Sequence, residues 1–580
     1  MLTSHPGTAP TSTVPGPQPT AGGLADRYDA VVAGGGIAGL AAAWELVRHG
    51  LRPLLVEARG YTGGLVASGP IAGVPMDLGA EGFVLRGTAV SEIAQTCGLE
   101  IVPPSGDGAR LYLPPLSEGV WALHRFPADA FLGIPASPMA ADVLSVIGEA
   151  AARRATADAE MGGLVGTSPE DPADLASFIC TRMGEAVLDR LVRPIVTGIH
   201  AADPADLAAD TVAPGLRAAT RRLGSLQAAV SEILAQRRAR TAGRTMDVTT
   251  AGGLARLPQA MREAIEAAGG RVCTRTGAQQ LRRINTDGSV GGLWELALTP
   301  TGRGATPSAE PVPTGAAQLV RTPLVVLACS ASAAQRLLAG AGVETALEVP
   351  QGSPIARFTL VAHAPELDGA PVGSGLLVAP VTDGTAPVSA KALSHLSVKW
   401  PWVGAGLHRL HGPHTHALRL SYGRPGEPRP EVTLEGALAD VEALTGVRIP
   451  KEHVLEHRLV RWDGTLPPVS VDYRAQAAQI VSQAEAQPGL GLTGAWVAGT
   501  GIAAVVAHAR TQAARLAGSL QITQPLTDTG TKGGTAGSAP VVAAPATGST
   551  STAKPATQNP DAHNTTTIRG RAADIEEECS

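Results

Sequence analysis

The stretch that most constrains the fold of this chain runs from residue 28 to residue 64. An apolar strand over 29–33 leads into the hexapeptide Gly34-Gly35-Gly36-Ile37-Ala38-Gly39. A run with helical spacing follows over 40–49, and a second apolar strand ends at Glu57. A strand, a glycine turn, a helix and a strand in this order are typical of a dinucleotide-binding βαβ unit.

Each part of this unit has a physical task. Gly34 permits a tight turn, Gly36 lets the backbone approach a pyrophosphate, and Gly39 lets helix and strand pack closely. The N-terminus of the helix presents N–H groups to the phosphate oxygens. Glu57 lies at about the 20-residue spacing at which an acid accepts hydrogen bonds from a ribose. The unit therefore predicts a bound dinucleotide rather than a glycine-rich turn without a ligand.

Two further glycines, Gly63 and Gly64, distinguish between the dinucleotides. With Glu57 they form an E-x6-G pattern that resembles the extended FAD signature of the amine oxidase and porphyrinogen oxidase group. In that group the glycines bring a second backbone segment against the pyrophosphate. The group usually has arginine four residues after the acid, where this chain has Tyr61, with Arg59 nearby. We therefore predict FAD as the cofactor.

Composition limits the other partners and the compartment. The chain has 580 residues, enough for two or three domains, and a net charge of −5, which argues against a nucleic-acid partner. The five cysteines are scattered and form no C-x-x-C pair, as expected in a reducing compartment. Neither a secretory signal nor an apolar run of about 18 residues is present, so we expect a cytoplasmic protein without a transmembrane helix.

The pattern along the chain predicts an α/β fold: an FAD-binding Rossmann-like domain, a mixed-sheet substrate domain and an inserted α-helical subdomain. We expect disorder at both ends, where the chain is rich in Pro, Thr, Gly, Ala or Ser. The expected division is 1–26 disordered, 27–104 the first FAD-binding segment, 105–245 mainly helical, 246–345 the second FAD-binding segment with a surface insertion at 300–318, 346–457 substrate domain, 458–520 the third FAD-binding segment, and 521–580 disordered.

Periodicity places the elements within this division. A short hairpin is expected over 110–123, and helices are expected over 140–157, 171–190 and 215–238. Strands near 271–275, 293–298 and 324–329 precede a helix at 331–339, and a strand at 491–494 precedes a helix at 503–516. The turn Gly499-Thr500-Gly501 would open this last helix next to the flavin ring, where its positive end stabilises negative charge on the reduced flavin. The alternative is an ordinary β-to-α connection.

Several segments, taken together and in order, resemble the protoporphyrinogen and coproporphyrinogen III oxidase family, especially its actinobacterial branch. Residues 194–203 are similar to the family element P-x-x-x-G-I-Y-A-G-D, with His200 in place of the tyrosine. Similar matches occur at 251–254 (G-G-L/M), 373–380 (G-x-G-F-L-V-P), 397–402 (S-S-K-W-P-W), 461–468 (R-W-x-x-A-x-P-Q) and 494–503 (G-A-x-x-x-G-x-G-I-P). In the last of these Ala503 replaces proline. The resemblance covers about residues 28–517.

The resemblance implies a six-electron oxidation of a porphyrinogen to a porphyrin in haem biosynthesis. FAD would take hydrides at N5, and O2 would reoxidise it to give peroxide. The preferred substrate is expected to be coproporphyrinogen III, with protoporphyrinogen IX as the alternative. The resemblance leaves open peripheral contact with a membrane and handover of the product to a ferrochelatase.

The same resemblance assigns candidate site residues. Four propionates call for cations, and Arg110, in a match to R-Y/F-I, and Lys399 are the expected carboxylate contacts; the alternative for Arg110 is a solvated arginine. No general base is identified, because the flavin carries the chemistry. Trp462 could instead be plain core. The expected FAD neighbours are Gly34, Gly35, Gly36, Ile37, Ala38, Gly39, Glu57, Ala58, Gly64, Gly79, Ala80, Glu81, Gly82, Val272, Trp462, Thr500, Gly501 and Ile502.

Two rival functions and one rival site stay open at this level. Another FAD oxidase, such as an amine oxidase or a carotenoid desaturase, would share the nucleotide unit but not the motifs at 199–203 and 399–402. A non-catalytic flavin-fold carrier of porphyrin is open because of the departures at Tyr61, His200 and Ala503. His408, His411, His414 and His416 have spacings that fit no standard zinc site, so we expect a solvated loop and no metal.

Overall fold

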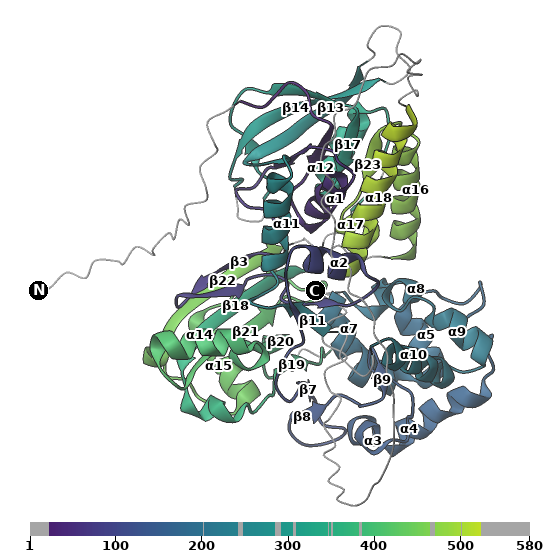
Figure 1. Cartoon of the computed structure of the whole chain (residues 1–580). Coiled ribbons are helices and arrows are strands. Elements are labelled where there is room, and N and C mark those ends of the chain that lie inside the picture. Colours follow the sequence, from purple (N-terminus) through teal and green to yellow (C-terminus); the bar gives the residue numbers. More distant parts are fainter. Residues whose placement is uncertain are drawn as a thin grey trace, which may run out of the picture.

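The computed structural model describes residues 23–200, 202–241, 247–284, 292–305, 309–345, 347–349, 352–381, 386–463, 470–499 and 501–523. Nearly all of the two ends expected to be disordered, and Thr500 of the last glycine turn, lie outside these residues. The described chain forms a nucleotide-binding region at the top of Figure 1, a second large sheet at lower left and a group of helices at lower right.

The nucleotide-binding region is built on a five-stranded parallel sheet. Its order is β12 (Arg271–Thr274), β2 (Pro53–Glu57), β1 (Ala30–Ala33), β17 (Leu324–Leu327) and β23 (Leu490–Leu492). All four pairings are parallel, and β1 is fully buried between β2 and β17. Continuous apolar strands such as these require cover on both faces of the sheet.

Helices and a second small sheet supply that cover. On one face α1 (Ile37–Arg48) packs against α11 (Arg256–Ala267) and α18 (Ile502–Thr523) in one apolar core. On the other face a second core joins α12 (Ala331–Gly340) and α16 (Val471–Glu485) to the antiparallel strands β13 (Thr276–Ile284), β14 (Leu293–Gly302) and β16 (Gln318–Thr322). The Rossmann-like fold that the glycine motif predicted is confirmed.

The second sheet has seven strands and is mixed. Its order is β22 (Val454–Asp463), β18 (Pro354–His363), β21 (Thr415–Tyr422), β20 (Ala392–His395), β19 (Gly375–Val378), β7 (Ala109–Leu113) and β8 (Ala122–Arg125). Only the pairing of β19 with β7 is parallel. The predicted hairpin at 110–123 is confirmed as β7 and β8, but it extends this sheet instead of joining the helical subdomain. Likewise β22 crosses the expected boundary at residue 458.

The helical group has its own core. Its main helices are α3 (Ala141–Ile147), α4 (Glu149–Thr156), α5 (Leu175–Met183), α7 (Arg193–His200), α9 (Leu216–Leu223) and α10 (Leu226–Thr241). All three predicted helices are interrupted at a glycine. Gly148 (φ +77°) separates α3 from α4, Gly184 (φ +92°) separates α5 from α6 (Glu185–Val187), and Gly224 (φ +88°) ends α9, because glycine adopts left-handed backbone angles at little cost.

The remaining elements connect these three regions. Strand β11 (Asp247–Thr250) pairs with β5 (Phe83–Val84) and β6 (Ile101–Val102) beside the nucleotide-binding region. The expected surface insertion contains β15 (Val312–Pro313), which pairs with the end of β14. The others are β3 (Ser68–Ile71), β4 (Val74–Asp77), α2 (Ala89–Thr96), β9 (Ala130–Phe131), β10 (Ile134–Pro135), α6 (Glu185–Val187), α8 (Ala209–Val212), α13 (Leu396–Lys399), α14 (Pro401–His411), α15 (Leu434–Thr445), α17 (Ala495–Ala498), the 3-10 turns at 157–160, 204–206, 365–369 and 451–453, and a π turn at 188–192.

None of the helices in the described residues combines the length and the apolar sequence needed to cross a bilayer.

Candidate cofactor and active site

The glycines after β1 form a close-packed cradle. A Cβ on Gly39 would lie 1.8 Å from the carbonyl oxygen of Gly34, and a Cβ on Gly35 would lie 2.7 Å from Cβ of Glu57. Gly34 has φ +113° and donates its N–H to the carbonyl of Val56 at 2.8 Å. Side chains are excluded at these three positions, so α1 begins directly against the carboxyl end of β1.

The space in front of α1 fits a pyrophosphate. A Cβ on Gly36 would meet nothing within 4 Å among the described residues, and no side chain caps α1 at this position. Gly63 donates its N–H to the carbonyl of Gly35 at 2.8 Å and so brings the second glycine pair alongside, where Gly64 approaches Gly36. The first helical residues, Ile37 and Ala38, therefore present N–H groups to an open, electropositive space.

Glu57 is held in place by the backbone around it. Its two carboxylate oxygens accept the N–H groups of Gly35 and Arg59, each at 2.7 Å. Burial raises the pKa of Glu57 against the lowering effect of these two donors. A carboxylate has further lone pairs, so Glu57 can still accept hydrogen bonds from ribose hydroxyls. Tyr61, which stands where the group usually has arginine, is 42% exposed.

The other expected nucleotide contacts lie at the same edge of the sheet. Val272 lies on β12 opposite Leu55 of β2, and the carbonyl of Ala58 accepts the Thr301 hydroxyl at 2.6 Å. Gly501 is open, with nothing described within 4 Å of an added Cβ, and Ile502 begins α18. Their roles as cofactor contacts stay predictions.

The loop 79–82 is pressed against its neighbours. A Cβ on Gly79 would lie 1.9 Å from the carbonyl oxygen of Leu65 and 3.3 Å from the indole of Trp462. Trp462 donates its indole N–H to the carbonyl of Leu78 at 3.1 Å, and Ala80 donates its N–H to Leu65 at 3.0 Å. The sequence could not decide between core and site for Trp462; the structure places it against this loop.

Glu81, in the same loop, is the centre of a buried ion cluster. Its Oε1 lies 3.0 Å from Nη2 of Arg419 and 3.5 Å from Nζ of Lys399. Trp400 donates its indole N–H to Oε2 at 3.1 Å, and Ser394 donates its hydroxyl to Oε1 at 3.3 Å. Burial alone would raise the pKa of Glu81, but Arg419 and Lys399 lower it to about 2. Its carboxylate is therefore ionised, and it is turned toward the seven-stranded sheet.

Two members of this region were missed in the sequence. Asp77 accepts the N–H groups of Leu254 and Ala255 at 2.9 and 3.0 Å, at the start of α11. Burial raises the pKa of Asp77 to about 7 despite these donors. Arg419 lies in the buried strand β21 and donates to the carbonyls of Asp77 and Gly79, each at 3.3 Å. An arginine between two leucines, Leu418 and Leu420, was the one signal that could have found it.

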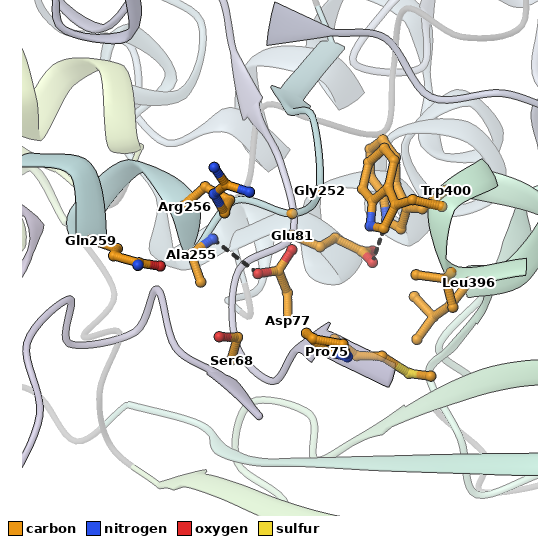
Figure 2. Close-up of a pocket in the computed structure, with 14 residues that line it drawn as sticks. Ser68, Pro75, Asp77, Glu81, Gly252, Ala255, Arg256, Gln259, Leu396 and Trp400 are labelled. Carbon is orange, nitrogen blue, oxygen red and sulfur yellow. Dashed lines mark hydrogen bonds between the residues drawn. The ribbon is translucent and has the colours of Figure 1, made fainter. Parts of the chain in front are cut away.

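A cavity of about 220 Å³ lies behind the loop, between the end of β4, the start of α11 and the start of α14. Figure 2 shows Asp77 and Glu81 on its wall, with the Ala255 and Trp400 hydrogen bonds to them. Trp402, stacked on Trp400 with ring centroids 5.3 Å apart, lines it too.

Arg110 and Lys399, the predicted substrate contacts, are both engaged within the protein. Arg110 is 12% exposed, and its Nη2 lies 2.6 Å from Oδ2 of Asp107, which Arg125 also contacts at 2.7 Å. Lys399 is 5% exposed and pairs with Glu81. Ser105 joins the two neighbourhoods, because its N–H donates to the carbonyl of Lys399 at 2.9 Å. Both roles stay predictions.

Helix α7 carries two buried polar atoms without a partner among the described residues. They are Oγ1 of Thr197 and Nε2 of His200, one helical turn apart. Burial, together with the charge of Arg86, lowers the pKa of His200 to about 4, so the imidazole is neutral at pH 7. A buried polar atom left unpaired is costly, which makes this face of α7 a candidate ligand contact. A Cβ on Gly198, between them, would lie 2.8 Å from Cδ2 of Leu377 on β19.

The expectation of one solvated histidine loop is wrong. His408 and His411 lie on α14, and His411 contacts the carbonyl of Ala72 at 2.8 Å. His416 lies on β21, is 5% exposed and contacts Asp368 at 2.9 Å. Four histidines close in sequence are therefore divided among a helix, a turn and a strand, with His414 in the turn. No group of three or more His, Cys, Asp or Glu in the described residues is arranged to hold a metal ion.

His416 continues inward to a second, unexpected histidine. Nδ1 of His416 lies 3.1 Å from Nε2 of His395, which is fully buried on β20. Burial, and then the neighbouring His416, lowers the pKa of His395 to about 3. Hydrogen bonds from His416 and His414 hold the pKa of Asp368 below its usual range. His395, at the buried end of this cluster, is therefore neutral, and Asp368, at its exposed end, is ionised.

The parallel sheet, the glycine cradle and the acid at the end of β2 define the class as a dinucleotide-binding protein with a Rossmann-like fold. The sequence profile described as flavin containing amine oxidoreductase matches residues 37–363. The chain belongs to this family, and it is an FAD-dependent oxidoreductase. The predicted cofactor and fold class are confirmed.

Named relatives agree with the resemblance seen in the motifs. A coproporphyrinogen III oxidase of Mycobacterium tuberculosis H37Rv is 29% identical over 493 residues, which cover 82% of this chain and 95% of that protein. A coproporphyrinogen III oxidase of Propionibacterium freudenreichii is 31% identical over 231 residues, 40% of this chain and 42% of that protein. The crystal structure of a putative protoporphyrinogen oxidase from Exiguobacterium shares the fold, with TM-score 0.63 and 20% identity over 86% of this chain and 100% of that chain.

Gly36→Ala tests the cradle. The added methyl group meets nothing described within 4 Å, so the thermal unfolding midpoint of the apoprotein is expected to stay unchanged. The methyl group would occupy the space of the pyrophosphate, so FAD affinity, measured by titration of the apoprotein, is expected to fall at least about tenfold. Gly518→Ala on α18, also in open space, is the matched control. Unchanged FAD affinity in Gly36→Ala would place the cofactor elsewhere.

The buried histidine predicts acid sensitivity. Because the pKa of His395 is lowered to about 3 in the folded state, the unfolded chain binds one more proton between that value and about pH 6.5. Its contribution to stability is therefore complete above pH 6.5 and is lost as pH falls. His395→Gln is expected to flatten the pH dependence of the unfolding free energy in this window by up to about 1.4 kcal/mol per pH unit. Denaturant unfolding at several pH values measures it, and equal slopes would contradict the assignment.

Proposed function

We propose that this chain oxidises coproporphyrinogen III to coproporphyrin III, with FAD as the cofactor and O2 as the final acceptor, in haem biosynthesis. The observation that carries the proposal is the match to the mycobacterial coproporphyrinogen III oxidase along 95% of that protein's length. The nucleotide cradle, the seven-stranded sheet and α7 all fall within the described residues of this chain. The match covers 82% of this chain, so the proposal rests on more than a shared nucleotide unit.

The reaction removes electrons and protons from the macrocycle and breaks none of the bonds that form its ring. Coproporphyrinogen loses six electrons and six protons in three two-electron steps, each matched by reduction of one O2 to peroxide. Bound FAD supplies the hydride-accepting chemistry. The tasks left to the protein are to hold a flat macrocycle, to neutralise its carboxylates and to keep water out.

Side chains at one end of the second sheet are suited to the carboxylates. Arg110 and Arg125, on the paired strands β7 and β8, share the single carboxylate of Asp107, so the group keeps one net positive charge. Arg125 is 58% exposed and can turn to an incoming propionate. A guanidinium and a carboxylate form paired, charge-assisted hydrogen bonds. We assign this group to propionate binding.

Helix α7 is suited to the face of the macrocycle. Thr197 and His200 offer hydrogen-bonding atoms that the described protein does not use, and the neutral His200 can accept or donate. Porphyrinogen pyrroles carry N–H donors, which such atoms would pair. His200 stands where the family pattern has tyrosine, and an imidazole keeps a polar atom at that position.

Protoporphyrinogen IX is the second candidate, because the Exiguobacterium protein of the same fold is named a putative protoporphyrinogen oxidase. It carries two propionates where coproporphyrinogen carries four, so the arginine group favours the tetracarboxylate. A carrier without catalysis is the alternative of another class. Handover to a ferrochelatase and contact with a membrane stay predictions.

Aerobic turnover of both porphyrinogens by the purified flavoprotein, followed by porphyrin fluorescence, tests the proposal. We expect faster turnover of coproporphyrinogen III, with bleaching of the flavin spectrum when the substrate is added without oxygen. Equal or reversed rates would remove the preference for the tetracarboxylate. A flavin spectrum that no porphyrinogen bleaches would leave a carrier or an FAD oxidase that acts on another class of substrate.

Arg110→Gln tests the carboxylate contact. Loss of a charge-assisted bond is worth about 1.5–3 kcal/mol, so KM for coproporphyrinogen is expected to rise about tenfold or more while kcat changes less. Arg153→Gln, at an exposed ion pair on α4, is the matched control and is expected to leave both constants unchanged. An unchanged KM in Arg110→Gln would assign the arginine to holding the 107–109 loop alone.

A further inference from the structure

The buried cluster around Glu81 lies between the nucleotide-binding region and the seven-stranded sheet. Glu81 belongs to the loop 79–82, whereas Arg419 comes from β21 and Lys399 from the end of α13. The exposed fractions of the three residues are 8% for Glu81, 2% for Arg419 and 5% for Lys399. Two cations and one anion are thus held out of solvent next to a loop that we expect to border the flavin ring.

The charges do not cancel. One carboxylate faces two cations at 3.0 and 3.5 Å, which leaves one net positive charge on the three side chains. Arg357 adds to the positive potential, because it too lowers the pKa of Glu81. Asp77 is a further acid beside the cluster: burial raises its pKa to about 7, whereas the N–H groups at the start of α11 favour its ionised form. Charges act over longer distances in a buried site than in water.

Lys399 pairs with Glu81, whereas the sequence predicted that it contacts a substrate propionate. Its ammonium lies 3.5 Å from Glu81 and 5.4 Å from the ring centroid of Trp400, and its side chain is 6% exposed. A propionate that replaced Glu81 as its partner would leave the Glu81 carboxylate with one cation fewer. Breaking a buried pair in this way is costly. Lys399 is therefore better placed to act on the loop than on a carboxylate arriving from solvent.

We propose that the Lys399–Glu81–Arg419 cluster sets the reduction potential of the bound FAD by holding a net positive charge beneath the loop 79–82. The inference rests on the proposed placement of the flavin along this loop. Reduction adds negative charge to the cofactor, and a fixed positive charge favours the reduced state. The cluster residues are positioning residues, since they act on the cofactor through their charge and not by touching the substrate.

A purely structural cluster is the competing explanation. The same ion pairs tie the loop to the seven-stranded sheet, and Arg419 also donates to the carbonyls of Asp77 and Gly79. If the ion pairs only held the loop in place, removing the lysine or the glutamate charge would loosen the loop in the same way. The reduction potential would then shift in the same direction in both variants, or not at all. An electrostatic role requires shifts of opposite sign.

The experiment measures the two-electron midpoint potential of the FAD-loaded enzyme by equilibrium reduction with a reference dye, without oxygen. Lys399→Met removes a cation and is expected to lower the potential, whereas Glu81→Gln removes the anion and is expected to raise it. Each shift should change the ratio of reduced to oxidised flavin at least about tenfold at a fixed potential, which is about 30 mV for a two-electron couple. Lys399→Arg keeps the charge and is expected to stay near wild type.

Glu295→Gln is the matched control. Glu295 is 2% exposed and is also held by two arginines, Arg282 and Arg321, but it lies on β14. Figure 1 shows β14 at the top of the molecule, away from β20 and β21. The potential of this variant is expected to be unchanged. Stoichiometric flavin absorbance and a cooperative unfolding transition above the assay temperature identify the variants that are folded, and Lys399→Gln serves if Lys399→Met does not fold.

Shifts of the same sign in the lysine and glutamate variants, or no shift in either, would overturn the inference. The outcome is separate from that of the proposed function. An enzyme that oxidises no porphyrinogen but shows opposite shifts would retain the cluster's role, and an active enzyme without shifts would lose it.

Discussion

The fold depends on the close contact between the start of α1 and the end of β1. A Cβ on Gly39 would lie 1.8 Å from the carbonyl oxygen of Gly34, so helix and strand meet only if this position has no side chain. This contact aims the N-terminus of α1 at the space beside Gly36 and places Gly35 on the carboxylate of Glu57. The parallel sheet, its helices and the proposed path of FAD all follow from that direction.

The chain leaves the nucleotide-binding region twice and returns each time. Strands β12, β17 and β23, which complete the parallel sheet, come from positions separated by the helical group and by most of the second sheet. The loop 79–82 is where the two sheets meet, because Glu81 reaches Arg419 and Lys399 across the boundary. Two sheets with separate cores are thus joined at the loop along which the flavin is proposed to lie.

Sequence patterns predicted those strands, turns and helices that are determined by neighbouring residues in the chain. The strands around the glycine motif, the β7–β8 hairpin and the helix after Gly501 were found because period and turn residues mark them. The histidines at 408–416 misled for the converse reason: α14 ends at His411 and β21 begins at Thr415, so neighbours in sequence face different surroundings. The sequence could not predict that β7 and β22 belong to one sheet, since pairing between distant strands leaves no local pattern. For the same reason it could not predict that Glu81 is the partner of Lys399.

The sequence by itself determined the nucleotide unit, the cofactor and the fold class. It could do so because the spacing of glycines and the period of apolar residues are local properties. Over a few residues, the residue types themselves determine the backbone conformation. Only the tertiary structure decided which charges face one another. Asp77 became the acceptor for the start of α11, and Arg419 and Lys399 became partners of Glu81. Burial then set their ionisation, because the cost of a charge depends on surroundings that the folded chain alone creates.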